Sequence, residues 1–149
     1  MKKPSAKNSI VPVHLLKIAV GIDSLEHFRE RMKIRRKQGK TFTHYTRHMP
    51  KRAEEVLAGG SLYWIVKGHI AVRCPIVGLE EAVLENKGPH CGIVMKSELI
   101  QVLPQPRRPH QGWRYLEDED APADLADAGK GAAEMPPELL AELRALGLL

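Results

Sequence analysis

The sequence predicts a small α+β domain in which a mixed or barrel-like β-sheet packs with two helices. The first observation is the most apolar and aromatic stretch of the chain, residues 57–73, which is rich in residues that favour β-strands. The second is a pair of segments with helical signals, residues 25–38 and 51–58. The third is size, because 149 residues with 43% apolar content suffice for one domain with a core, plus tails.

A pair of strands is predicted to form the centre of the domain. A helix ends at Gly59-Gly60, and residues 61–66 follow as a strand. Gly68 separates this strand from a second one over residues 69–77, which Pro75 is expected to break. The rest of the sheet is expected to assemble around this pair.

Two aromatic residues in the first central strand are expected on opposite sides of the sheet. Side chains alternate along a strand, so Tyr63 and Trp64 cannot both point into one core. One of them faces the core, and the other faces a second layer, a partner or solvent. Trp64 is expected in the core, because large aromatic side chains usually bury most of their surface.

A buried strand and a helix are predicted before this centre. Residues 13–20, VHLLKIAV, are apolar enough to be buried on both faces of a sheet. Asp23 and Glu26 then have the spacing of a capping box, and Gly39 lies where the helix is expected to end. Between them runs an apolar stripe at helical spacing, formed by Leu25, Phe28 and Met32.

A half-exposed strand and a short helix are predicted next. Residues 41–48, TFTHYTRH, alternate β-forming and polar residues, so Phe42 and Tyr45 are expected on opposite faces. Pro50 interrupts this strand and suits the first turn of the helix over residues 51–58.

Further strands are predicted after the centre. Residues 79–84 continue the sheet or turn out of it. Residues 91–95 and 98–103 form two strands or one long bent strand. The proline-rich segment 104–109 is extended and cannot be a central strand, because proline donates no backbone hydrogen bond. Residues 113–116 end the globular part.

The chain is predicted to divide into four parts. The α+β domain covers residues 13–116, after a basic and disordered N-terminus over residues 1–12. Residues 117–134 are expected to be an acidic linker. Residues 135–149 are predicted as a short helix that needs a surface to pack on, because a helix of that length is marginal alone. Its apolar stripe consists of Leu139, Leu140, Leu143 and Leu146.

Charge is distributed unevenly along the chain. The net charge is +5, but residues 1–52 carry +11, residues 53–116 carry +1 and residues 117–149 carry −7. A basic first part indicates an anionic partner, unless the acidic tail folds back and neutralises it.

No segment predicts a membrane span or secretion. No stretch approaches the ~18–20 apolar residues that cross a bilayer. The apolar run near the N-terminus is interrupted by Pro12, His14 and Lys17 and lacks a cleavage site. Cys74 and Cys91 provide no disulfide framework. A soluble cytoplasmic protein without a membrane partner is expected.

The sequence contains no recognisable catalytic, metal-binding or cofactor motif. Ser61 lacks the Gly-x-Ser-x-Gly pattern of an activated serine. Cys91 cannot pair with His90, because neighbours on a strand face opposite ways. His44 and His48 would lie about 13 Å apart along a strand, which is too far to share a metal ion. No catalytic residue, metal site or cofactor is therefore expected.

Basic residues interleaved with aromatic residues form the strongest functional pattern. Binding of single-stranded nucleic acid requires both, because guanidinium groups pair with phosphates while bases stack on aromatic rings. In the alternative, the arginines pair with nearby glutamates and the tryptophans belong to the core. The predicted nucleic-acid- or anion-binding residues are Arg47, Lys51, Arg52, Lys67, Arg73, Arg107, Arg108, Trp113, Arg114 and Tyr115.

Part of this set is expected to converge on one concave face. Short connections usually keep consecutive elements adjacent, and the prolines of the segment 104–109 can lay the last strand against the sheet edge. The residues expected to converge come from four segments and are Arg47, Lys67, Arg73, Arg108 and Trp113.

Several blocks of the sequence resemble one family. They are LLKIAVGIDSLE at residues 15–26, the segment 50–81, PQPRRPHQGWRYL at residues 104–116 with EDAPADL after it, and MPPELLAELRALGLL at residues 135–149. Together they resemble the bacterial family known as domain of unknown function 1489. That family has no assigned activity, so the resemblance implies no catalytic residues.

A second resemblance concerns architecture. A helix ending in glycine, an aromatic strand and a late aromatic strand are similar to the small PUA- and ASCH-like barrels, which mostly bind RNA or modified nucleotides. The Gly-x-Lys-x-x-Glu-x-Arg pattern of ASCH domains is absent from this sequence. The analogy therefore concerns the fold alone.

Together these patterns favour a small binding domain for RNA or a nucleotide-like anion. One alternative is a protein–protein interaction module that uses the C-terminal leucine helix. The other is a small enzyme that acts on a nucleotide.

Overall fold

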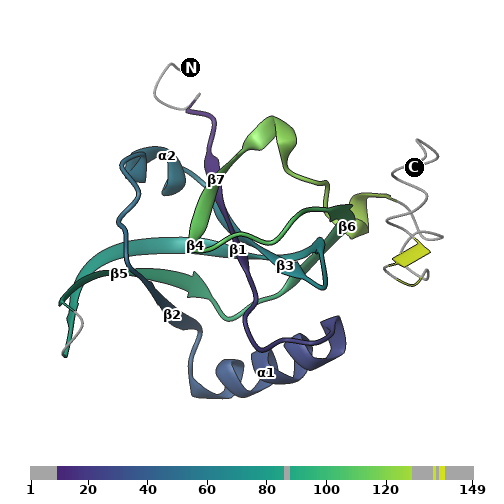
Figure 1. Cartoon of the computed structure of the whole chain (residues 1–149), viewed down its shortest axis with the longest axis horizontal. Coiled ribbons are helices and arrows are strands. Elements are labelled where there is room, and N and C mark those ends of the chain that lie inside the picture. The colour runs from purple at the N-terminus through teal and green to yellow at the C-terminus, as the bar shows by residue number, and fades with distance from the viewer. Residues whose placement is uncertain (1–9, 86–87, 129–135, 137, 140–149) are drawn as a thin grey trace.

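The computed structural model describes residues 10–85, 88–128, 136, 138 and 139. Within them the fold consists of seven strands, two α-helices and two short 3₁₀ helices (Figure 1). The strands are β1 (Val13–Ile18), β2 (Thr41–Thr46), β3 (Ser61–Val66), β4 (His69–Leu84), β5 (Gly88–Lys96), β6 (Ile100–Pro106) and β7 (Trp113–Glu117). The helices are α1 (Leu25–Gln38), α2 (Ala53–Val56), η2 (Asp118–Asp120) and η3 (Leu125–Ala128).

The strands form a mixed sheet that does not close into a barrel. Their order is β2-β5-β4-β3-β1-β7, and β6 also pairs with β4. β1 and β3 are parallel, whereas the other pairs are antiparallel. In the described part of the chain no ladder joins β2 to β7, so a seam remains between them. The α+β class is confirmed, with an open sheet in place of a barrel.

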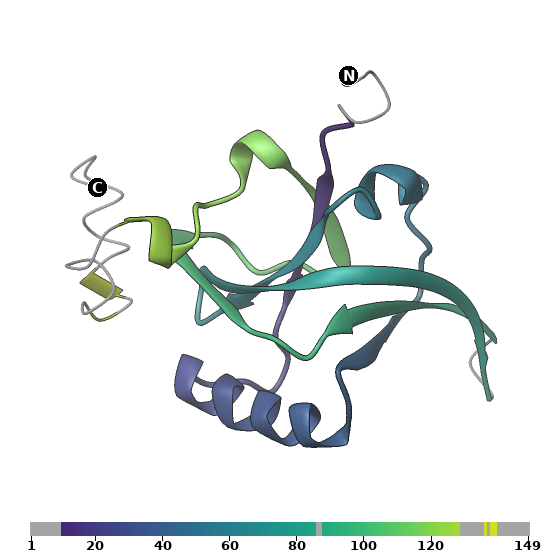
Figure 2. The ribbon, with the colours of Figure 1, turned by 180° about the vertical axis from the view of Figure 1, so that it is seen from behind.

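The long strand β4 connects the two halves of the sheet, as both ribbon views show (Figures 1 and 2). Its first half pairs with β3 on one side and β6 on the other, and its second half pairs with β5. β5 and β6 therefore follow one another along β4, separated by residues 97–99. The second half of β4 contains residues 79–84, for which continuation of the sheet was one of the two predictions.

The central hairpin forms as predicted around its glycine. Lys67 and Gly68 both have positive φ angles, 50° and 79°, which is the conformation of a type I′ turn between antiparallel strands. The predicted break at Pro75 is wrong, because β4 continues through it. Pro75 lies opposite Ser61 at the start of β3, and the next N–H, of Ile76, donates to the Gly60 carbonyl. The proline is tolerated because β4 changes partners there.

Both faces of the central strands are buried. One face, which we call the α1 face, packs against α1 and β5, and Trp64 lies in it. The opposite face packs against the chain that follows β7, and Tyr63 lies there. The predicted core position of Trp64 is confirmed, and the second layer that Tyr63 faces is made by the protein itself. Burial of β1 on both faces is also confirmed.

The helices agree with the predictions except at their ends. The N-cap of α1 is Ser24, whose hydroxyl accepts the His27 N–H; the predicted capping box at Asp23 is wrong. α2 covers four residues, fewer than the predicted 51–58. The turn from α2 into β3 requires Gly60, because a Cβ there would lie 2.4 Å from the Val13 carbonyl oxygen.

The edge strands follow the polarity of their sequences. β6 includes two prolines, and among the described strands it pairs with β4, as expected for a strand that cannot be central. β2 ends at Thr46, two residues before the predicted end, and it directs Phe42 toward the core while Tyr45 is 45% exposed.

The first part of the predicted acidic linker is folded onto the sheet. Residues 118–128, with the end of β7, form what we call the acidic segment, residues 117–128. Leu125 is buried, and the Leu103 N–H donates to the Ala123 carbonyl. The predicted disordered N-terminus and C-terminal helix lie largely outside the described residues. Among the described helices, none has the length and apolar character needed to cross a bilayer.

Candidate functional site

Four of the predicted binding residues line one groove. It lies between the end of β2 and strand β7, has a volume of about 800 Å³, and is called here the β2–β7 groove. His48, His90 and Glu81 contribute polar groups to its walls. The four predicted residues come from two segments, the connection after β2 and strand β7, and are Arg47, Lys51, Trp113 and Tyr115.

Trp113 is partly exposed and connects the two edges of the sheet beside the groove. Its indole N–H donates to the His48 carbonyl at 2.9 Å. Its ring packs edge to face against Tyr115, with 4.9 Å between the ring centroids. The hydrogen bond joins β7 to the loop after β2, and it fixes the orientation of the indole.

Arg52 lies next to the groove but already has two carboxylate partners. Its guanidinium donates to Glu55 and to Glu117 at 2.8 and 2.7 Å. These hydrogen bonds raise the pKa of Arg52 and lower the pKa of both carboxyl groups. Its backbone N–H donates to the Tyr115 hydroxyl. Arg52 therefore organises the start of α2, with its charge balanced inside the protein.

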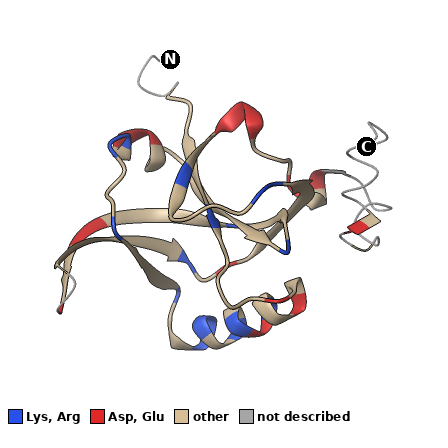
Figure 3. Ribbon diagram, viewed as in Figure 1, with Lys and Arg blue, Asp and Glu red and all other residues tan. Residues whose placement is uncertain are grey.

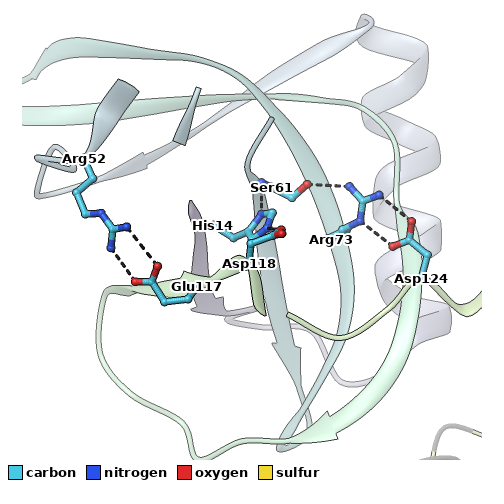
Figure 4. A network of polar contacts seen from close by, with 7 residues as sticks. All are labelled: His14, Arg52, Ser61, Arg73, Glu117, Asp118 and Asp124. Carbon is cyan, nitrogen blue, oxygen red and sulfur yellow. Dashed lines mark hydrogen bonds and ion pairs between the residues drawn. The ribbon is translucent and has the colours of Figure 1, made fainter. Parts of the chain in front are cut away.

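Arg73 lies on the opposite side of the sheet from the groove. Its guanidinium donates to both carboxylate oxygens of Asp124 at 2.8 Å and to the Ser61 hydroxyl (Figure 4). The hydrogen bonds raise the pKa of Arg73 and lower that of Asp124. Of the five residues predicted to converge, Arg47 and Trp113 line the groove. The prediction is wrong for Arg73, which lies on the other side of the sheet and pairs with the acidic segment, and for Lys67 and Arg108, which lie outside the groove.

The remaining predicted residues lie outside the groove. Lys67 occupies the exposed turn between β3 and β4, and the Arg107 N–H donates to the Gly68 carbonyl beside it. Arg108 and Arg114 are exposed, and Arg114 alternates with Trp113 along β7, so the two side chains point to opposite faces.

Three residues resemble a catalytic triad in type but not in geometry. His14 lies between Ser61 and Asp118, with its Nε2 2.7 Å from Asp118 (Figure 4). Its Nδ1, however, accepts the backbone N–H of Ser61, and the Ser61 hydroxyl accepts from Arg73. No free imidazole nitrogen reaches that hydroxyl, so the serine is not activated. The cluster instead ties the acidic segment to β1 and β3.

The cysteines are also unsuited to nucleophilic chemistry. Burial raises the pKa of Cys74 to about 12 and raises that of Cys91. Both thiols therefore stay protonated at neutral pH, whereas a nucleophilic cysteine needs a lowered pKa. Within the described residues, no three His, Cys, Asp or Glu side chains are grouped as metal ligands.

A second hollow, of about 410 Å³, lies between α1 and the sheet and is called here the α1 cavity. The end of β1, the start of β2, strand β3 and α1 form its walls. Three cations line it, Lys17, Arg31 and Arg35, and no Asp or Glu is among the described lining residues. α1 carries six Lys or Arg residues and two Glu residues, which appear as blue and red segments of its ribbon (Figure 3). The helix as a whole is therefore basic.

The electrostatics of the α1 cavity follow from these unpaired cations. Burial lowers the pKa of Lys17. Burial, Lys17 and Arg35 together lower the pKa of His44 to about 4, so its imidazole is neutral at pH 7. Removing a cation from water without an anion nearby is unfavourable, and the lowered pKa values express that cost.

Aromatic side chains form part of the wall of the α1 cavity, beside aliphatic ones. Trp64 packs edge to face with Phe28 and with His44, at centroid distances of 5.6 and 5.3 Å. The Arg35 guanidinium lies 4.7 Å from the centroid of Phe42. Nε2 of His44 is buried without a hydrogen-bond partner among the described residues, and the Trp64 indole N–H faces only the Cys74 thiol, a weak acceptor.

The cationic residues of this cavity were not among the predicted binding residues. Two signals were present: Lys17 interrupts an otherwise apolar strand, and Arg31 and Arg35 are spaced i, i+4 beside the buried Phe28 and Met32. Neither signal reveals a cavity, because only the packing angle of α1 on the sheet creates it.

The chain matches a known protein family. The match to the family described as "Protein of unknown function (DUF1489)" covers residues 15–149. The chain belongs to this family. In this DUF1489 protein, all the lining residues of the groove and the cavity fall within the matched range. No curated protein and no solved structure matched the chain, so the similarity to PUA-like domains is not confirmed.

Proposed function

We propose that this protein binds a nucleotide-like anion in the α1 cavity. The observation that supports this is the composition of the cavity, which combines three cations with aromatic walls and has no described carboxylate among its lining residues. Its volume, about 410 Å³, is within the usual range for small-molecule sites.

The cations are placed to hold a phosphate group. Arg31 and Arg35 are one helical turn apart on α1, and Lys17 belongs to the strand on the other wall. Neither Lys17 nor Arg31 forms a salt bridge with a described residue. An anion between them offsets the cost of the half-buried, unpaired Lys17 amine and forms charge-assisted hydrogen bonds with all three cations.

The aromatic side chains of the cavity favour an anion that also carries a flat, weakly polar group. A base can pack against the rings of Phe28, Phe42 and Trp64, as bases do in sites that take single nucleotides. The neutral imidazole of His44 supplies a hydrogen-bonding edge, because its Nε2 lacks a partner in the described structure. A simple inorganic anion leaves these features unused.

Calorimetric titration with 5′-mononucleotides, the matching nucleosides and inorganic phosphate tests the proposal. Mononucleotides should bind more tightly than either fragment, and Arg31→Ala or Arg35→Ala should weaken binding about tenfold or more. Lys37→Ala is the matched control, since Lys37 is exposed on the same helix and does not line the cavity.

Absence of binding for every mononucleotide at millimolar concentration would overturn the proposal. Equal affinity for phosphate and mononucleotides would also overturn it, because the aromatic walls would then contribute nothing. Thermal unfolding of each variant separates loss of binding from loss of fold.

A further inference from the structure

The α1 cavity and the β2–β7 groove share no described lining residue, but their linings meet in the β1–β7 ladder. Lys17 of the cavity and Trp113 of the groove are directly opposite in the β1–β7 ladder. Side chains of such cross-strand partners lie on the same face with Cβ atoms about 5 Å apart. On the other wall, His44 lines the cavity and Arg47 the groove, about 10 Å further along the same chain.

The groove offers the chemistry that a second nucleotide requires. Arg47 and Lys51 are exposed and form no salt bridge with a described residue. Trp113 and Tyr115 provide aromatic surface next to them. Glu81 is the acidic residue among the described lining of the groove, so the cations outnumber it. Phosphate on the cations and a base against the rings is the usual arrangement for single strands.

We infer that the ligand is a single-stranded nucleic acid, with one nucleotide in the α1 cavity and its neighbour in the β2–β7 groove. This inference rests on the proposed nucleotide site and extends it. A base that packs against the aromatic side chains of the cavity is unstacked from its neighbours, as in single strands and not in a paired duplex. A duplex is therefore excluded as the bound form.

Charge restricts the path of the strand on the other side of the sheet. The acidic segment lies there. It contains the acidic helix η2, which begins at Asp118, and also Asp124 and Asp127 (Figure 3). Phosphates are repelled from that surface. The remaining paths from the cavity are the β2–β7 groove and the outer surface of α1, and the adjoining aromatic residues favour the groove.

An affinity series with oligonucleotides of one to eight residues tests the inference. Fluorescence anisotropy with labelled oligouridine and oligoadenosine should show tighter binding from one to two or three nucleotides, followed by a plateau. The double variant Arg47→Ala/Lys51→Ala should lose this gain, about tenfold or more, and keep the affinity for mononucleotides. For this variant, the slope of log K against log salt concentration should be shallower by roughly 1.4, since two phosphate contacts are lost.

A second double variant serves as the matched control. Lys33→Ala/Lys37→Ala removes the same charge from the outer surface of α1 and should leave the gain with length unchanged. If this variant loses the gain and the groove variant keeps it, the strand follows α1 and the inference is wrong.

Three outcomes separate the inference from the proposed function. Mononucleotide binding without any gain in longer strands overturns the inference and leaves the nucleotide site in place. Tighter binding of a duplex than of the single strand also overturns it. Absence of binding at every length overturns both. The same series with oligodeoxynucleotides measures whether the 2′-hydroxyl contributes, and weaker binding of DNA identifies RNA as the ligand.

Discussion

Basic side chains beside the acidic segment have carboxylate partners, whereas those of the α1 cavity have none among the described lining residues. Carboxylates of the segment pair with Arg52, His14 and Arg73 (Figure 4). In the cavity, Lys17, Arg31 and Arg35 line a hollow without a described carboxylate. Matched charges hold the acidic segment against the sheet, whereas unmatched charges cost stability and are the basis of the proposed anion site. The difference between the two regions, rather than the number of basic residues, indicates the site.

The largest effect is expected from breaking a matched pair. Asp124→Ala leaves the Arg73 guanidinium mostly buried without its carboxylate, so the free energy of unfolding should fall by about 2–4 kcal/mol. Urea unfolding measures this. Asp127→Ala, an exposed change in the same segment, should cost less than about 0.5 kcal/mol. Equal values for the two variants would show that the Arg73–Asp124 pair does not hold the segment.

The next effect concerns the pH dependence of stability on the cavity side. The pKa of His44 is about 4 in the folded protein, against 6.5 for the free group. Between these values the unfolded chain binds more protons, so stability should fall as pH decreases from 6.5 toward 4, by up to about 3 kcal/mol. The stability difference between the wild type and His44→Gln, measured by urea unfolding from pH 7 to 4, isolates this term. A difference that does not vary with pH would contradict it.

The smallest expected effect is an increase in stability, and it tests most directly whether the cations of the cavity lack partners. Lys17→Met removes an unmatched, half-buried cation, and burial already lowers the pKa of that amine. The free protein should therefore become more stable, by up to about 1 kcal/mol, while nucleotide affinity falls. A thermal shift with and without mononucleotide measures both quantities. A destabilised Lys17→Met variant would mean that the amine has a partner and that the cavity is not a site of unmatched charge.

Local features of the fold were predictable from the sequence, and features that depend on distant contacts were not. The hairpin around Gly68 and the burial of Trp64 follow from glycine placement and strand alternation, which act over a few residues. The passage of β4 through Pro75 depends on a change of strand partners, which local sequence does not encode.

The same distinction applies to the candidate site. The groove residues Arg47 and Trp113 could be identified because basic and aromatic residues are adjacent in the sequence there. Arg73 was predicted together with them, but Asp124, 51 residues later in the sequence, pairs with its guanidinium. The α1 cavity could not be predicted, because it exists only where α1 packs over the ends of β1 and β2.

The open seam between β2 and β7 gives the sheet an adjustable width. A closed barrel expands only by breaking a ladder of backbone hydrogen bonds, each of which must find a new partner. Among the described contacts, hydrogen bonds that involve side chains cross this seam: the Trp113 indole donates to the His48 carbonyl, and Arg52 donates to Tyr115 and Glu117 of β7. Each exposed hydrogen bond of this kind contributes roughly 1 kcal/mol. A change in the width of the gap between the two edges would therefore break these few contacts and no backbone ladder.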